Sequence, residues 1–200
     1  QPESAYELWD TTDVIGVDPY PVPGSPLTLV RDWVQAGIGT GRPVWAVIQA
    51  FNKANYSPGP SFRPPTAGEY RAMAFITLAS GATGLLAYSY HDLRREPDFE
   101  RRWAEMEAVN RMLRRFGEIV SEGEWEPVAC KGVVAARWRL RGQEHLLLVN
   151  PGPSPVSVSL SLGAFRDGTE GFTRKRIAIV SGRIRRMLPA FGAEWLILGH

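Results

Sequence analysis

Short apolar runs alternate with amphipathic segments over the first half of the chain. Three runs, at 13–18, 43–49 and 85–90, contain Val, Ile, Leu and Ala and end in polar or aromatic residues. Runs of this length that are apolar on both faces are typical of strands buried in a parallel sheet. Trp45, in the middle of the second run, is therefore predicted to lie in the core. Parallel strands need crossover connections, which the intervening segments supply as helices.

Helices are predicted at residues 4–10, 27–37, 70–80 and 97–116. In the second and fourth of these, apolar residues recur at intervals of three and four positions. Thr66 and Glu69 stand three positions apart just before the third helix, which is the spacing of a capping box. Ser4 and Glu7 repeat that spacing near the N-terminus. Gly117 suits the end of the last helix.

The pattern changes after about residue 126, where apolar and polar residues alternate in several short segments. The predicted strands are 133–140, 144–150, 156–162, 173–180, 183–188 and 194–198. Turns that contain Gly or Pro separate them, which is typical of an antiparallel β-sandwich. We therefore predict an α/β domain over residues 1–118, a linker at 119–126 and a β-sandwich domain over 127–200.

Composition excludes several classes of protein. The chain has 200 residues, 44% of them hydrophobic, and a single cysteine, so neither a disordered chain nor a disulfide scaffold fits. A net charge of +2 gives no strong field for nucleic acid. The uncharged stretch 72–88 is too short and too interrupted for a membrane span, so a buried helix followed by a buried strand accounts for it. The basic runs 174–176 and 183–186 are interpreted as a solvated face, with weak polyanion contact as the alternative.

The sequence also lacks the motifs of several common enzyme chemistries. It has no phosphate-binding loop, no dinucleotide-binding GxGxxG and no GxSxG nucleophile elbow. Three scattered histidines and one cysteine do not make a zinc site. We therefore expect no cofactor and no metal, and neither nucleic acid nor a membrane as a partner.

Polar and aromatic residues follow all three predicted parallel strands. The strand ends carry Asp18 and Tyr20, then Gln49, Phe51 and Asn52, then Tyr90, His91 and Asp92. The carboxyl ends of parallel strands meet at one edge of a sheet or barrel, where binding and catalytic residues gather. Side chains that combine hydrogen-bonding groups with flat apolar faces suit a sugar or another polyol.

Each candidate also has a purely structural interpretation. Asp18 precedes a proline and can form an Asx turn at the strand end. Tyr20 can pack within its proline-rich loop, and Gln49 can be a satisfied core amide. Adjacent residues of a strand point to opposite faces, so His91 and Asp92 are not expected to form a dyad and can serve the loop instead.

Three stretches carry a resemblance to a known family. "DVIGVDPYPVP", "GRPVWAVIQAFN" and "PPTAGEYRAMAFITLASGATGLLAYSYHD" are similar to the sixth strand, the seventh strand, and the seventh helix with the eighth strand of (β/α)8-barrel glycoside hydrolases. The tail, "EHLLLVNPGPSPVSVSL" to "FGAEWLILGH", is similar to the β-sandwich that closes many such enzymes. The resemblance implies a partial barrel of three strands followed by that sandwich, and an oligo- or polysaccharide as the ligand.

The sequence departs from this family in two respects. The family places a nucleophilic Glu at the end of the seventh strand, where this sequence has Gln49, and an amide cannot act as a nucleophile or general base. The family's acid/base lies on the fourth strand, which is not among the predicted three. The resemblance therefore implies that the catalytic carboxylates lie upstream, or that Asp18 is one of them. It implies substrate binding by Tyr20, Gln49, Phe51, Asn52, Tyr90, His91 and Asp92.

Three functions stay open at this point. The chain is part of an O-glycosyl hydrolase, a non-catalytic carbohydrate-binding relative, or a half-barrel that folds only against the N-terminal half of the same protein or a second copy. A complete barrel takes about 250 residues, and the chain opens on Gln1 rather than Met, so we expect the C-terminal portion of a larger protein. The sequence does not fix the compartment, although the resemblance favours a secreted or periplasmic protein.

Overall fold

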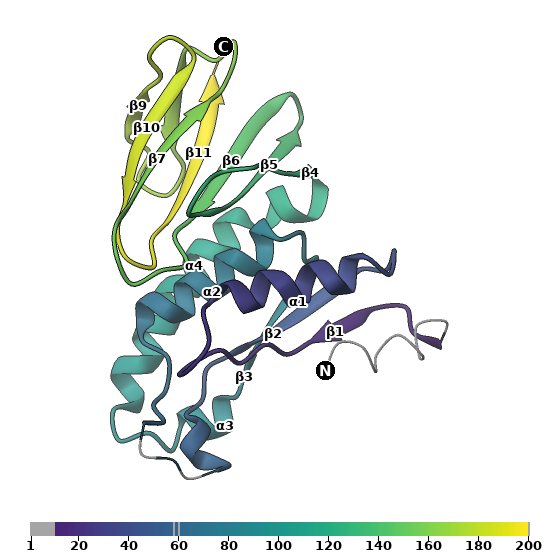
Figure 1. Ribbon diagram of the computed structural model, residues 1–200, viewed down its shortest axis with the longest axis vertical. Coiled ribbons are helices and arrows are strands. Elements are labelled where there is room, and N and C mark those ends of the chain that lie inside the picture. The colour runs from purple at the N-terminus through teal and green to yellow at the C-terminus, as the bar shows by residue number, and fades with distance from the viewer. Residues whose placement is uncertain (1–10, 58, 60, 200) are drawn as a thin grey trace.

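A three-stranded parallel sheet forms the first part of the protein, as the apolar runs predict. The computed structural model describes residues 11–57, 59 and 61–199. Strands β1 (Ile15–Val17), β2 (Val44–Gln49) and β3 (Gly84–Tyr88) lie in the order β1-β2-β3, and both pairs are parallel. Their carboxyl ends therefore lie at the same edge of the sheet (Figure 1).

Helices α1 (Thr28–Ile38) and α2 (Ala67–Ala79) cover one face of this sheet, and α3 (Tyr90–Leu93) and α4 (Phe99–Glu122) follow it in the chain (Figure 1). A short 3-10 helix, Lys53–Asn55, lies in the loop after β2. The predicted capping box at the start of α2 is confirmed, because Thr66 and Glu69 each bond to the backbone N–H of the other. The helix predicted at 4–10 lies outside the described residues.

The last helix is longer than the sequence predicts. It begins at Phe99 rather than Pro97 and runs through Gly117 to Glu122. Gly117 is exposed, whereas Phe116 and Ile119 are buried on either side of it. Burial of an extra apolar turn outweighs the roughly 1 kcal/mol that a helical glycine costs.

The two faces of the parallel sheet have different environments. The side chains of Val44, Ala46 and Ile48 are buried beneath the helices. Trp45 is 45% exposed on the opposite face, so its predicted place in the core is wrong. Its ring lies over Gly84 of the neighbouring strand, where a Cβ atom would collide with it. Strand alternation puts every second residue on this opposite face, which the helices do not cover.

Antiparallel strands make up the second part of the protein (Figure 1). A six-stranded sheet has the order β4-β5-β6-β11-β8-β9, and β7 and β10 form a separate two-stranded ribbon. The strands are β4 (Glu124–Pro127), β5 (Val134–Leu140), β6 (Gln143–Val149), β7 (Val156–Ser161), β8 (Asp167–Glu170), β9 (Arg176–Ala178), β10 (Arg183–Leu188) and β11 (Ala193–Gly199). Buried residues of the ribbon, including Val158, Ile184 and Leu188, share one apolar cluster with Leu146 and Leu196 of the large sheet.

Two of these strands were not predicted. β4 begins directly after α4, so residues 119–126 belong to the helix and to this strand, where the sequence had suggested a linker. β8 has the sequence DGTE, whose residues, except Thr, have low strand propensity. It exists because it pairs with both β11 and β9, a tertiary contact that alternation along the chain does not reveal.

The two parts share a continuous core. Helices α2 and α4 pack against the large antiparallel sheet. The ring of Phe116 on α4 meets Trp138 of β5 and Trp195 of β11 edge-on, with centroid distances of 5.1 and 5.2 Å. Aromatic pairs of this geometry contribute beyond their buried area. The helices of the first part are therefore held firmly against the second.

Candidate functional site

Four aromatic rings meet at the carboxyl ends of the three parallel strands. Tyr20 follows β1, Phe51 and Tyr56 follow β2, and Tyr88 ends β3. The Phe51 ring lies 5.0 Å from Tyr20, 5.2 Å from Tyr56 and 5.6 Å from Tyr88, edge-on in each case. Tyr20 and Tyr88 stack at 6.2 Å. We call these four residues the aromatic cluster.

Asp92 supplies the charge beside this cluster. The Tyr56 hydroxyl donates to Asp92 Oδ2 at 2.6 Å and lies 3.1 Å from the Tyr88 hydroxyl. Ser89 Oγ donates to the same carboxylate oxygen and accepts from the Asp92 N–H at 3.2 Å, so Ser89 caps α3. Chains of hydrogen bonds of this kind fix the orientation of each member. Three hydroxyls and one carboxylate are therefore held together at the end of β3.

The hydrogen bonds determine the protonation states at neutral pH. Burial acts to raise the pKa of Asp92, but hydrogen bonds from Ser89 and Tyr56, with the charges of His91 and Arg95, outweigh it and hold that pKa below its usual range. The bond to Asp92, followed by the bond to Tyr88 and by burial, raises the pKa of Tyr56. Burial, with the negative charge of Asp18, raises the pKa of Tyr20 to about 12. Asp92 is thus an ionised acceptor, and Tyr20 and Tyr56 keep their protons at neutral pH.

Gln49 lies beneath the cluster and faces backbone atoms. Its side chain is 0% exposed. Oε1 accepts from the N–H of Val22 at 2.9 Å, and Nε2 donates to the carbonyl of Val22 at 2.6 Å and to that of Phe51 at 3.1 Å. The amide therefore ties the proline-rich loop after β1 to the end of β2. In this geometry the amide fixes the backbone beside Tyr20 and at Phe51. This matches the interpretation of Gln49 as a satisfied core amide.

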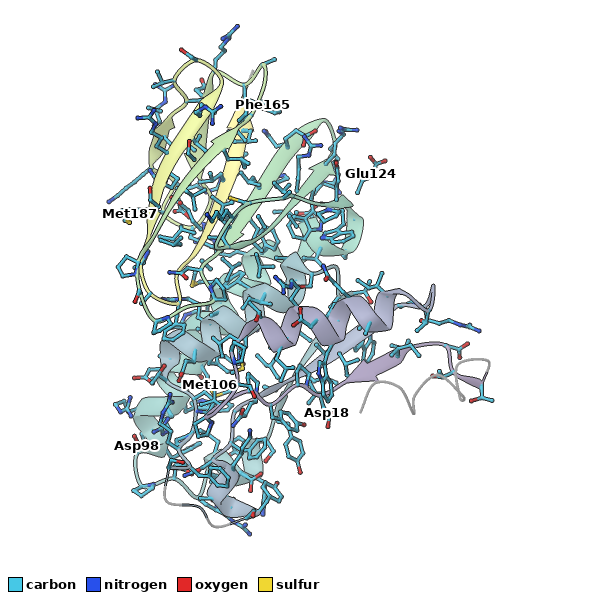
Figure 2. All side chains as sticks on the ribbon, in the orientation of Figure 1. Asp18, Asp98, Met106, Glu124, Phe165 and Met187 are labelled. Carbon is cyan, nitrogen blue, oxygen red and sulfur yellow. The ribbon has the colours of Figure 1, made fainter. Side chains whose placement is uncertain are left out.

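The other candidates from the sequence are dispersed around this edge. Asn52 Oδ1 accepts from the N–H of Ala54 at 3.0 Å and caps the 3-10 helix. Asp18 is exposed at the end of β1 and forms no side-chain hydrogen bond among the described residues (Figure 2). Tyr90, 56% exposed, packs against Phe99 at 6.1 Å and Trp103 at 5.4 Å rather than against the aromatic cluster. His91 is exposed beside Asp92.

Three residues of the cluster and its hydrogen-bond network were not among the candidates. Ser89 and Asp92 have the S-x-x-D spacing of a helix cap, so a search for caps after each strand would have found Ser89. Tyr88 lies two residues before Tyr90, the predicted end of the third strand. Tyr56 has no comparable signal, because its contacts with residues 32 and 36 positions away depend on the course of the loop after β2.

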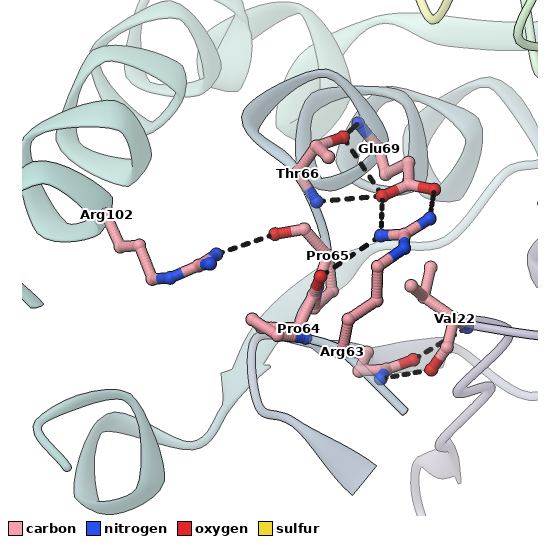
Figure 3. Close-up of polar contacts among 8 residues, drawn as sticks. Val22, Arg63, Pro64, Pro65, Thr66, Glu69 and Arg102 are labelled. Carbon is pink, nitrogen blue, oxygen red and sulfur yellow. Dashed lines mark hydrogen bonds and ion pairs between the residues drawn. The ribbon is translucent and has the colours of Figure 1, made fainter. Parts of the chain in front are cut away.

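That loop is anchored at its far end by charged side chains. Arg63 forms a two-pronged ion pair with Glu69 of α2, with both N–O distances at 2.7 Å. Arg102 on α4 donates to the carbonyl of Pro65 at 3.1 Å. Figure 3 shows Arg102 reaching Pro65 from α4, while Arg63, within the loop, extends to Glu69, which also accepts from the N–H of Thr66. The loop that carries Tyr56 is therefore fixed against two helices.

The described residues offer neither a metal centre nor a membrane-spanning helix. Within the residues that the structure describes, no group of three or more His, Cys, Asp or Glu side chains could hold a metal ion. Over the same residues, no helix is long and apolar enough to cross a membrane.

We expect Asp92→Asn to change how stability depends on pH. The pKa of Asp92 is lower in the folded protein than in the unfolded chain, so its ionised form stabilises the fold above the unfolded pKa of about 4. That contribution disappears as pH falls through the folded pKa. The difference in unfolding free energy between wild type and variant should therefore shrink between about pH 5 and about pH 2. Chemical denaturation at several pH values measures it, with Asp18→Asn as the control, and a constant difference would contradict the assignment.

Comparison with solved structures assigns the fold. The chain is similar to α-galactosidase I from Mortierella vinacea (11% identity, TM-score 0.59, 96% of this chain and 55% of that one). It is also similar to a β-L-arabinopyranosidase of glycoside hydrolase family 27 from Geobacillus stearothermophilus (11%, 0.52, 100% and 61%). A third is AmyP in complex with maltose (12%, 0.59, 82% and 44%).

The chain thus shares its fold with glycoside hydrolases, and the resemblance inferred from the sequence is confirmed at that level. It is a mixed α/β fold that spans about half the length of these three proteins. No family model matches the chain, and no curated protein matches its sequence.

Proposed function

We propose that this chain is part of a carbohydrate-binding protein of the glycoside hydrolase type, and that its sugar site is the aromatic cluster with Asp92. The observation that carries the proposal is the meeting of these side chains at the carboxyl edge of the parallel strands, in a fold shared with glycoside hydrolases. Aromatic rings offer flat faces to the C–H side of a pyranose, and fixed hydroxyls and a carboxylate bind its hydroxyl groups.

The uncovered face of the parallel sheet supports a partial barrel. Leu86 and Tyr88 are 49% and 42% exposed on the same face as Trp45, because residues paired in register share a face. β1 and β3 are both edges of the three-stranded sheet. Unpaired edges and a bare apolar face together favour further strands that close a barrel. We propose residues 1–118 as the last three strands of such a barrel and residues 127–200 as its β-sandwich domain.

Catalysis requires a second carboxyl group. Glycoside hydrolysis uses two, one of which must be protonated as the acid. Asp92 already accepts hydrogen bonds from Ser89 and Tyr56, whereas Asp18, among the strand ends described, is exposed and forms no side-chain hydrogen bond. We propose that Asp18 lies at the reacting centre and that the acid/base comes from other strands of the barrel. Gln49, where the family has a nucleophile, supports the alternative of a non-catalytic carbohydrate-binding protein.

Binding and hydrolysis are tested separately. Calorimetric titration with maltotriose and with an α-galactoside should detect binding, accompanied by a change in tyrosine and tryptophan fluorescence. Release of an aryl group from aryl glycosides supports the hydrolase, whereas binding without release supports the non-catalytic alternative. The absence of binding to any neutral oligosaccharide would contradict both.

Because one face of the sheet is bare, we expect the chain to self-associate or to bind the remaining strands of the barrel. We expect light scattering on the isolated chain to give a mass above the 22.2 kDa of a monomer. Charged side chains oppose burial, so the double variant Trp45→Lys with Leu86→Lys should return it to a monomer. Val180→Lys, at a 70% exposed apolar residue of the antiparallel part, is the control and should change nothing. A monomeric wild-type chain would argue against the partial barrel.

A further inference from the structure

Charge is divided unequally between the two parts of the chain. Residues 127–200 contain eleven basic and four acidic residues, whereas residues 1–126 contain twelve basic and seventeen acidic ones. The overall net charge of +2 therefore conceals a positive antiparallel part and a negative first part. An asymmetry of this kind points to a partner for the charged region.

The unpaired cations of the antiparallel part gather around β9 and β10. Four arginines of this part are held in ion pairs, namely Arg137, Arg139, Arg141 and Arg186. By contrast, Lys175 and Arg176 at β9 and Arg183 and Arg185 on β10 are exposed and form no ion pair within the described residues. Their charge is available to a ligand.

A hollow of about 530 Å³ lies between α4, β9 and β10, and Lys175, Arg176 and Arg186 line it. Its apolar lining includes Phe172 and Met187. Two carboxylates also face it, but both are occupied: Glu170 accepts from the N–H groups of Phe172 and Thr173, and Glu194 is paired with Arg186. The hollow therefore combines apolar walls with two cations that lack a partner.

The ribbon of β7 and β10 extends this surface. Arg183, Arg185 and Met187 alternate along the exposed face of β10, and Met187 is also part of the hollow. Figure 2 shows Met187 projecting outward from the ribbon. In register, Ser161 lies opposite Arg183 and Ser159 opposite Arg185, and both serines are exposed. From Arg183 to Met187 the strand rises by about 13 Å, so guanidinium and hydroxyl groups form a short ladder along this face.

We propose that the hollow and the ribbon together bind an acidic polysaccharide, a sugar chain that carries carboxylates. Guanidinium groups pair with carboxylates through two hydrogen bonds, serine hydroxyls bond to sugar hydroxyls, and Phe172 and Met187 suit the apolar side of a sugar ring. The choice of a sugar polymer, though not the positive surface itself, rests on the proposed carbohydrate function.

Affinity electrophoresis and calorimetry with polygalacturonate test this proposal, with dextran as the neutral polymer. We expect binding to polygalacturonate that weakens as salt is added, and none to dextran. Lys175→Ala with Arg176→Ala, and Arg183→Ala with Arg185→Ala, should each weaken binding about two- to thirtyfold, because each double variant removes two exposed ion pairs with the polymer. Arg42→Ala removes a partly exposed cation in the turn between α1 and β2, remote from this surface (Figure 1), and should leave the affinity unchanged.

The outcomes separate this surface from the aromatic cluster. Tyr88→Ala should not alter the affinity for polygalacturonate, and the arginine variants should not alter the affinity for neutral oligosaccharides. No binding to polygalacturonate, or equal binding to duplex DNA or to phosphatidylserine vesicles, would overturn the proposal and leave the neutral sugar site standing. Binding to polygalacturonate with no neutral sugar bound would support this surface and count against the aromatic cluster.

Discussion

Gln49→Glu is expected to destabilise the fold by about 3–5 kcal/mol at neutral pH, the cost of an unpaired buried charge. In the wild type, Gln49 Nε2 donates to the carbonyls of Val22 and Phe51 at 2.6 and 3.1 Å. In the variant a carboxylate oxygen, which can only accept, faces the same two carbonyls. The substitution also places a carboxylate at a site with no exposure to solvent. Introducing the Glu that the sequence resemblance implies at this position should therefore weaken the protein rather than create a catalyst.

The pH dependence identifies the cause. Burial without a cation raises the pKa of a carboxyl group, so the introduced Glu should be protonated in the folded state at mildly acidic pH. Because the pKa of this Glu is higher in the folded protein than in the unfolded chain, its destabilising effect is absent below the unfolded pKa. The loss of unfolding free energy then grows as the pH rises through the folded pKa. Denaturant titrations of Gln49→Glu should show that trend relative to wild type, whereas Gln49→Met should lose about 1–3 kcal/mol at every pH. Wild-type stability with new hydrolytic activity in Gln49→Glu would show instead that this position reaches the substrate.

Tyr88→Ala is expected to weaken binding of a neutral oligosaccharide at least tenfold with only a small loss of stability. The ring is 42% exposed and contacts Tyr20 and Phe51, so its removal opens the centre of the aromatic cluster. It also takes away the hydroxyl beside Tyr56. A stacking face and a hydrogen bond together are worth more than 1.4 kcal/mol, which corresponds to a factor of ten in affinity.

Tyr90→Ala provides the comparison. Tyr90 is equally aromatic and more exposed, but its ring packs against Phe99 and Trp103 rather than against the aromatic cluster. We expect its removal to change affinity less than twofold. A loss as large as that of Tyr88→Ala would extend the sugar site across α3, as the sequence had suggested for Tyr90. Equal affinity for wild type and Tyr88→Ala would remove the aromatic cluster from the site.

The parallel strands were predictable because their apolar runs are local signals. The Thr66–Glu69 box likewise needs only two residues at a fixed spacing. β8 was not predictable, since its DGTE sequence becomes a strand only through pairing with β11 and β9. Trp45 was misassigned because a run that is apolar on both faces implies a sheet that is buried on both faces. The face of this sheet that carries Trp45 is not covered by the helices, and Trp45 is partly exposed there.

The meeting of the strand ends at one edge was predictable, whereas the full set of residues that contact one another there was not. Topology alone brings the ends of β1, β2 and β3 to one edge, so Tyr20, Phe51 and Asp92 were identified from their places after the strands. Tyr56 joins them through a hydrogen bond to Asp92 that spans 36 positions. For Gln49 the sequence suggested more than the structure supports. A polar residue at a strand end is typical of a ligand-binding group, but the hydrogen-bond partners of Gln49 are backbone atoms.

A crystal structure of the protein soaked with maltotriose or an α-galactoside tests the central claim most directly. The account predicts a sugar ring stacked on Tyr20 or Tyr88, with hydroxyl groups bonded to the Tyr56–Asp92 network. A sugar bound elsewhere, with the aromatic cluster empty, would contradict it.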